Sequence, residues 1–288
     1  MICLNPLLIP NKRMKDKWTS HDYYDDPFIF VPCGRCEACR KKHANDWRVR
    51  LTKELELGNH RSCWFITLTV DGPNYHSFVS NTSRFIRLFL ERYRARYKRS
   101  LRHWFVTELG EDNGRLHIHG FVFDCRCSIR EFTKLWGYGI TNVRINPDLD
   151  VIGYLVKYML KPCKYDESFY PSVFCSSGIG KQYLTPRSFR LHRTQTNPII
   201  RVGCFIYSLP RYYFAKIFDS VNYRHFLKIQ SLFNPRRRRY FFRGIFYSAY
   251  DSYATSVRLF FEDSLKRGSS FIKPICSLLK YNPYVTYA

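Results

Sequence analysis

Residues 115–123 read Arg-Leu-His-Ile-His-Gly-Phe-Val-Phe and predict a short β-strand with two histidines separated by one apolar residue. Side chains alternate along a strand, so His117 and His119 share one face and Ile118 lies on the other. Two imidazoles side by side on a strand suit a pair of metal ligands. The alternative interpretation is a strand whose two histidines have no common role.

A carboxylate in the preceding segment extends this candidate site. Residues 103–109 are rich in β-forming side chains, and residues 110–114, Gly-Glu-Asp-Asn-Gly, favour a hairpin turn. Symmetric folding about that turn would place Glu108 opposite His117, whereas a slip of one residue would move Glu108 to the other face. One carboxylate and two imidazoles suit Mg²⁺ or Mn²⁺ with open coordination positions. Glu111, in the turn, is the alternative carboxylate.

The charge of the chain indicates a polyanionic partner. The 288 residues carry a formal net charge of +24, and 45% of them are hydrophobic, enough for a substantial core. So large a positive charge predicts nucleic acid as the partner before a membrane surface. Aromatic residues make up 18% of the chain, and aromatics interleaved with basic residues suit single-stranded nucleic acid. A basic protein with an aromatic core is the alternative.

The chain has 11 cysteines. The apolar segment at residues 4–10 is too short for a secretory signal and is broken by prolines, and the sequence predicts no membrane span. We therefore expect a reducing, intracellular compartment in which the cysteines are free or bound to metal.

Three of the cysteines form a short motif. Residues 33–39 read Cys-Gly-Arg-Cys-Glu-Ala-Cys, and this spacing of Cys33, Cys36 and Cys39 resembles half of a zinc site. Three reduced thiols leading into a helix is the interpretation that the sequence favours, because structural zinc sites use four ligands. If zinc binds, the fourth ligand would come from His43, Cys63 or Cys3.

The order of predicted elements indicates an α+β fold. From residue 63 to residue 161 the order is β-α-β-β-α-β-α, which predicts an antiparallel sheet with packed helices, of the ferredoxin or RRM type. The predicted elements are a helix at 40–57, strands at 63–70 and 138–145, helices at 81–99, 128–136 and 150–161, and the hairpin. We expect an N-terminal arm with the cysteines and a helix over residues 1–60, the α+β domain over 61–165, and a mostly helical, basic, aromatic-rich region over 166–288.

The last predicted helix carries the second chemical signal. At about 100° per residue, Tyr154, Lys157, Tyr158 and Lys161 occupy one arc, and the apolar remainder would face the sheet. An aromatic ridge with snorkelling lysines is the alternative. A nucleophilic tyrosine needs help to lose its proton, since its free pKa is near 10. An adjacent ammonium group or a metal-bound phosphate would give that help.

The C-terminal third contains a strongly basic run at residues 235–243. Four successive arginines precede aromatic residues there and predict contacts to phosphates, with a solvated basic face as the alternative. These arginines are Arg236, Arg237, Arg238 and Arg239. Residues 178–181 resemble part of a Walker A loop, but the first glycine of that motif would fall at Cys175. The sequence therefore predicts no built-in ATPase or helicase.

In combination these motifs resemble a known family. Residues 65–69 (Phe-Ile-Thr-Leu-Thr), the histidine strand preceded by Glu108, and residues 154–158 (Tyr-Leu-Val-Lys-Tyr) follow in the order of the HUH endonucleases. The chain is similar in particular to the replication initiators of the microviruses, small single-stranded-DNA phages, and especially to the gokushovirus branch. Residues 32–41, which hold the cysteine motif, resemble the N-terminal signature of that group. The resemblance covers about residues 31–165.

The resemblance implies a metal-dependent DNA endonuclease that starts rolling-circle replication. A tyrosine would nick single-stranded DNA at the origin, forming a 5′-phosphotyrosine intermediate and a free 3′-OH, and a later step would rejoin the strand. The paired tyrosines of the family map to Tyr154 and Tyr158, and the lysine between them maps to Lys157. Thr67 and Thr69 lie in the first motif and have a structural or DNA-facing role in this interpretation.

The same resemblance implies the cofactor and the partners. A divalent metal would be held by His117, His119 and Glu108, and the partners would be the single-stranded origin, a host DNA polymerase and a helicase in the cytoplasm of the bacterial host.

Three alternative functions remain on the sequence. A plasmid initiator, relaxase or transposase of the same nuclease type would use the same residues. A non-enzymatic single-stranded nucleic-acid-binding or packaging protein would explain the charge but not the histidine pair or the paired tyrosines. A zinc-dependent transcription regulator would explain only the cysteine motif.

Overall fold

The computed structural model describes residues 3–10, 28–110, 114–160, 169–194, 198–218, 240–242, 245–247 and 259. Internal contacts divide the chain into two units, residues 1–43 with 231–288, and residues 44–230. The long helix α1, Glu37–Leu57, begins in the first unit and continues into the second.

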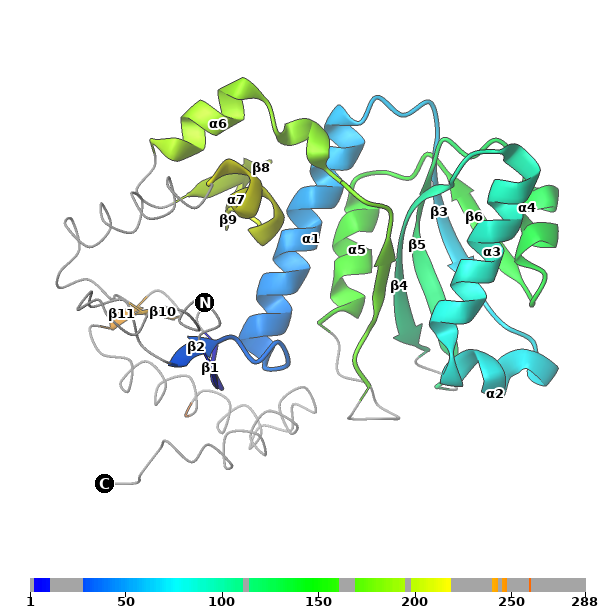
Figure 1. Cartoon of the computed structure of the whole chain (residues 1–288), viewed down its shortest axis with the longest axis horizontal. Helices are drawn as coiled ribbons and strands as arrows, with labels where there is room; N and C mark the ends of the chain where they lie inside the picture. Colours follow the sequence, from blue (N-terminus) through cyan, green and yellow to red (C-terminus); the bar gives the residue numbers. More distant parts are fainter. Residues whose placement is uncertain are drawn as a thin grey trace. The chain divides into compact units, whose positions relative to one another are not determined.

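A five-stranded antiparallel sheet organises the second unit (Figure 1). Its spatial order is β6-β3-β5-β4-β7, so among the first four strands the fourth lies beside the first, the first beside the third, and the third beside the second. This is the arrangement of a ferredoxin-like β-α-β-β-α-β unit, and it confirms the predicted α+β fold. The strands are β3 (Cys63–Leu68), β4 (Arg102–Leu109), β5 (Leu116–Phe123), β6 (Thr141–Ile145) and β7 (Val173–Cys175).

The helices between these strands differ slightly from the predicted ones. The predicted helix at 81–99 is preceded by a further helix, α2, Gly72–Ser80, and begins as α3, Thr82–Tyr97, where the Asn81 side chain accepts a hydrogen bond from the amide of Arg84. The other helices of this part are α4, Ile129–Trp136, and α5, Asp150–Tyr158. Helix α5 ends at Tyr158, before Lys161, which lies outside the described residues.

One face of the sheet is covered by α2, α3 and α4. Ile66 of β3 and Ile118 of β5 are fully buried there against Phe89 of α3 and against Phe132 and Trp136 of α4. Trp136 also donates its indole N–H to the carbonyl of Thr69 at 2.8 Å. Apolar residues at alternate strand positions therefore form this core layer.

The opposite face is covered by α1 and α5. Trp104 of β4 and Phe121 of β5 pack against Trp47 and Leu51 of α1 and against Leu155 of α5, and Figure 1 shows both helices on the same side of the strands. Since the side chains of His117, His119 and Glu108 have the same strand parity as Trp104 and Phe121, this is also the face of the candidate site.

A buried ion-pair network joins α1 to the sheet. Glu54 is fully buried, and its carboxylate accepts hydrogen bonds from Arg102 at 2.5 and 2.8 Å and from the backbone N–H of Gly180 at 2.6 Å. His60 lies 2.7 Å from Glu54 and 2.8 Å from Asp124. Burial alone would raise the pKa of Glu54, but the hydrogen bonds from His60, Arg102 and Gly180 lower it to about 2.

This network should make stability depend on pH at both ends. Burial opposes the charged form of His60, but its bonds to Glu54 and Asp124 raise its pKa overall. The contribution of Glu54 is lost as the pH falls from about 4.5 towards 2, and that of His60 is lost as the pH rises from about 6.5 through the raised pKa. We expect Glu54→Gln to cost about 3 kcal/mol in the free energy of unfolding at pH 6.

Urea unfolding followed between pH 3 and pH 9 measures this effect. The matched control is Glu56→Gln, since Glu56 is an exposed neighbour that pairs with Lys53 at 2.6 Å on the surface, and it should change the unfolding free energy by less than about 1 kcal/mol. Equal losses in the two variants would contradict the role given to the buried network.

The described residues after 168 contain strands as well as helices, whereas the sequence predicted a mostly helical region. Strand β7 extends the main sheet beside β4, which a helical prediction could not anticipate because the pairing is remote in sequence. The other elements of the second unit are a 3₁₀ turn (Lys181–Tyr183), α6 (Pro186–Arg193), β8 (Ile199–Val202), β9 (Phe205–Ser208) and α7 (Arg211–Ile217).

The first unit contains two short antiparallel hairpins. Strand β1, Leu7–Pro10, pairs with β2, Phe28–Val31, and β10, Tyr240–Phe242, pairs with β11, Ile245–Tyr247. Among the described helices, none has the length and apolar character needed to cross a membrane.

Candidate functional site

The hairpin register agrees with the sequence prediction. Glu108 of β4 pairs with His117 of β5, and Val106 pairs with His119. Neighbouring cross-strand positions point to the same face of a sheet, so Glu108 and both imidazoles lie on one side. The register, on which the choice of Glu108 depended, is therefore confirmed. The alternative carboxylate, Glu111, lies outside the described residues.

His119 contacts polar groups through both ring nitrogens. Its Nε2 lies 2.8 Å from Oε2 of Glu108, and its Nδ1 lies 3.0 Å from Oγ1 of Thr67. Thr67 is the residue of β3 that pairs directly with His119. If the ring donates its Nδ1 proton to Thr67, the lone pair is on Nε2, which is the tautomer needed to bind a metal through that atom.

His117 is a half-buried imidazole on the same strand. Its pKa is lowered, first by burial and then by the nearby His119 ring. The ring centroids of the two histidines are 6.2 Å apart. A lowered pKa keeps His117 neutral near pH 7, which is the form that binds metal ions.

These side chains fit a divalent metal in their chemistry. Nε2 of His119 and Nδ1 of His117 are buried and make no hydrogen bond of regular geometry among the described residues. The 2.8 Å separation of Nε2 from the Glu108 oxygen is near the roughly 3 Å between adjacent octahedral ligands with bonds of about 2.1 Å. The set is not closed, however, because ligand atoms from Glu108, His117 and His119 do not all lie within 4.8 Å of one another. His117 would have to move towards the other two around an ion.

The two tyrosines of α5 lie beside this histidine pair. The ring of Tyr158 stacks on that of His119, with centroids 4.6 Å apart and an interplanar angle of 22°. The ring of Tyr154 lies 4.8 Å from that of Tyr158. The paired phenols predicted from the helical spacing therefore occupy the same face of the sheet as the imidazoles.

The two phenols differ in their surroundings. Tyr154 is 52% exposed and Tyr158 only 6%. The pKa of Tyr158 is raised, first by burial and then by a hydrogen bond with Tyr154, with a further contribution from Glu108. Tyr158 thus keeps its proton more firmly than a free tyrosine, and the exposed Tyr154 is the more accessible of the two.

The remaining predicted residues are distributed as follows. Lys157 is exposed on α5 between the two tyrosines. Cys33, Cys36 and Cys39 lie together with Cys3 at the start of the chain. The basic run Arg236, Arg237, Arg238 and Arg239, predicted to contact phosphate, lies outside the described residues.

The sequence prediction assigned Thr67 a structural or DNA-facing role and did not connect it with His119. The sequence held one usable signal, the position of Thr67 in a strand of alternating character. It could not show that β3 would pair with β5, because the two residues are 52 positions apart.

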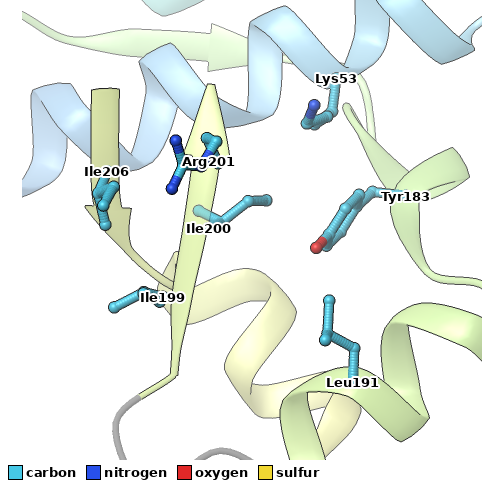
Figure 2. A pocket seen from close by; sticks show the side chains of 7 residues that line it. All are labelled: Lys53, Tyr183, Leu191, Ile199, Ile200, Arg201 and Ile206. Carbon is cyan, nitrogen blue, oxygen red and sulfur yellow. The ribbon is translucent and has the colours of Figure 1, made fainter. Parts of the chain in front are cut away.

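A cavity of about 320 Å³ lies in another part of the second unit (Figure 2). It is lined mainly by apolar side chains of α6, β8 and β9, with Lys53, Tyr183 and Arg201 as its polar members. Its walls include neither the histidines nor the tyrosines described above, and they contain no carboxylate. We therefore assign the chemistry to the histidine–tyrosine face and not to this cavity.

Comparison with known proteins agrees with that assignment of the domain. Residues 63–163 match the family model of the replication-associated protein ORF2. The chain is also 26% identical, over a 215-residue alignment, to the replication-associated protein ORF4 of Chlamydia phage 1, with 64% of this chain and 52% of the relative covered. The chain thus spans about half the length of this curated relative. No solved structure gives a significant match. These matches confirm the resemblance inferred from the motifs: the chain is similar to replication-associated proteins of the microvirus type, and residues 63–163 carry the likeness to the ORF2 family.

Proposed function

We propose that this protein nicks and rejoins single-stranded DNA at a phage replication origin and thereby starts rolling-circle replication. The observation that carries the proposal is the stacking of Tyr158 on His119, which brings a pair of phenols next to an imidazole that also meets a carboxylate. A nucleophile beside a metal-binding set is the arrangement that phosphodiester transfer requires.

Glu108, His117 and His119 would hold a Mg²⁺ or Mn²⁺ ion. When bound, the ion supplies Lewis-acid polarisation of the phosphate oxygens. Thr67 would fix the ring of His119 through its 3.0 Å contact with Nδ1. The stacked ring of Tyr158 would limit rotation of the same imidazole and exclude water from one of its faces.

A tyrosine would act as the nucleophile. Its phenol loses a proton, its oxygen forms a bond to phosphorus, and the bond from phosphorus to O3′ breaks, so the departing oxygen takes up a proton as a free 3′-OH. The 5′ side stays attached to the protein as a phosphotyrosine. This bond preserves the energy of the phosphodiester, and attack by a 3′-OH rejoins the strand without ATP.

We assign the first attack to Tyr154 and the second to Tyr158. Tyr154 is exposed to an incoming strand, whereas Tyr158 is buried against His119. Tyr158 can donate its hydroxyl proton to the oxygen of Tyr154, which would stabilise a Tyr154 phenolate. Lys157, exposed between them, would contact the phosphate. The free 3′-OH would then be extended by a host DNA polymerase behind a helicase, in the bacterial cytoplasm.

A pool of single-stranded DNA with a random central segment tests the function without knowledge of the origin. Incubation with Mn²⁺, denaturation and capture of the protein should recover DNA joined through its 5′ end, with a common sequence at the junction. Protease digestion and mass spectrometry should locate the bond on Tyr154 or Tyr158. Recovery of DNA that binds but is never cut or attached would contradict the proposal.

That contrary result would instead support the second candidate, a non-enzymatic single-stranded nucleic-acid-binding or packaging protein. The net charge of +24 favours binding of nucleic acid in either case. Only the enzyme, however, requires the tyrosines and histidines to lie together.

Thr67 offers a test of the histidine geometry. We expect Thr67→Val to raise the Mn²⁺ concentration for half-maximal cleavage about 10- to 100-fold, because the contact that orients His119 is lost. Thr67→Ser keeps the hydroxyl and should restore the Mn²⁺ dependence of the parent. An unchanged requirement in Thr67→Val would show that the contact does not affect metal binding.

A further inference from the structure

We propose that the first unit contains a second metal centre, a tetrahedral zinc site made by four cysteine thiolates. The ligands are Cys3, Cys33, Cys36 and Cys39, whose sulfur atoms all lie within 4.8 Å of one another. This set is separate from the histidine–tyrosine face and does not depend on the proposed nuclease activity. It supplies the fourth ligand that the sequence motif lacked.

The distances between the sulfurs match a shared zinc ion. Sγ of Cys3 lies 3.5 Å from that of Cys33 and 3.8 Å from that of Cys36, and Cys33 lies 4.0 Å from Cys39. Four thiolates with zinc–sulfur bonds of about 2.3 Å in a tetrahedron lie about 3.8 Å apart. A disulfide needs a separation of about 2.05 Å, and all four cysteines are free thiols in this structure.

The backbone around the cluster is arranged to stabilise sulfur anions. The amide of Cys33 donates to Sγ of Cys3 at 3.2 Å, and the amide of Cys36 donates to Sγ of Cys33 at 3.3 Å. The amide of Leu4 points at Sγ of Cys36 at 3.5 Å. Such N–H bonds to a ligand atom orient it and offset its negative charge.

Local conformation brings the three motif cysteines together. Gly34 adopts a φ of +76°, which lets residues 33–36 form a tight turn that other residues would strain. Cys36 directly precedes α1 and Cys39 lies in its first turn, where the helix N-terminus favours a thiolate. Arg35, Arg40, Lys41 and Lys42 surround the motif in sequence and would balance the net negative charge of a four-thiolate zinc centre.

The site would stabilise a segment that has little other structure. Strands β1 and β2 have only four residues each, too few for an independent core. A zinc ion would connect Cys3, just before β1, to Cys33 just after β2, and both to the start of α1. Binding of the ion and folding of this segment would then be one process.

The metal content of the purified full-length protein tests the inference. We expect about one zinc per chain by elemental analysis. We also expect Co²⁺ exchanged for zinc to give the intense visible absorption of a tetrahedral thiolate complex. Cys3→Ser should lose its metal to a competing chelator at least about tenfold more readily than the parent, because one of four ligands is removed.

Three further variants make the test specific. Cys204→Ser removes an exposed cysteine outside the cluster and should keep the zinc. The double variant His117→Ala, His119→Ala should also keep it, which separates this centre from the nuclease site. Cys3→His supplies a different zinc ligand at the same position and should recover binding if Cys3→Ser folds poorly.

The inference would be overturned by parent protein that contains no zinc after expression with added zinc. It would equally be overturned if Cys3→Ser and Cys204→Ser retained zinc alike, or if mass spectrometry of unreduced protein found the four cysteines paired in disulfides.

Discussion

Replacement of both tyrosines by phenylalanine, Tyr154→Phe with Tyr158→Phe, is expected to abolish covalent attachment to single-stranded DNA. The loss should be on the order of 10⁴-fold or more, because removal of a nucleophile removes the covalent route altogether. Binding should persist, since the phenylalanine rings keep the packing of Tyr158 on His119 and remove only hydroxyl groups. Attachment is measured by denaturing electrophoresis of labelled DNA, and binding by fluorescence anisotropy with the same strand.

The matched control is Tyr207→Phe, which removes a hydroxyl from β9, away from the candidate site residues in the sheet. It should attach DNA at the rate of the parent. The two single variants should differ: Tyr154→Phe should lose the first attachment, whereas Tyr158→Phe should attach once and fail to release and rejoin. Full attachment in the double variant would refute the assignment of both tyrosines.

Removal of an imidazole is expected to have the second largest effect. His119→Ala should lower Mn²⁺-dependent cleavage by more than about 100-fold, because polarisation of the phosphate by a metal ion is worth several kcal/mol. The same change also removes the partner of Glu108 and Thr67 and the ring on which Tyr158 stacks. His117→Ala should lose cleavage as well while leaving that stacked pair in place, and so reports on the metal alone.

Single-turnover cleavage over a range of Mn²⁺ concentrations measures these losses, and calorimetry with Mn²⁺ reports binding directly. His76→Ala, which removes an exposed histidine from α2, is the control for the loss of an imidazole as such. If His117→Ala cuts DNA as fast as the parent at low Mn²⁺, the proposed ligand set is wrong.

The parts of the site that the sequence could predict are local ones. The alternation of His117 and His119, and the turn that aligns Glu108, depend on contacts within about ten residues, so strand periodicity and turn chemistry suffice. The helical spacing of Tyr154 and Tyr158 is equally local. The strand order also followed from the succession of elements, because few topologies satisfy short connections and antiparallel pairing.

The parts that the sequence did not predict depend on contacts between distant residues. Thr67 meets His119 across 52 positions, and Cys3 meets Cys33 across 30. A helical pattern at residues 40–57 could not show that α1 would cover the same sheet face as α5. The difference in exposure between Tyr154 and Tyr158 also depends on tertiary packing, since one helix arc holds both.

The position of β5 inside the sheet has a consequence for how the enzyme would be supplied with its ion. Strand β5 is hydrogen-bonded along both edges, to β3 and to β4. Amides of such an interior strand are among the last to exchange with solvent, because they are released only when most of the domain opens. A protein molecule depleted of metal would therefore keep its imidazoles on a standing scaffold. Reloading would need only a small shift of side chains, at a rate set by arrival of the ion and not by refolding of the chain.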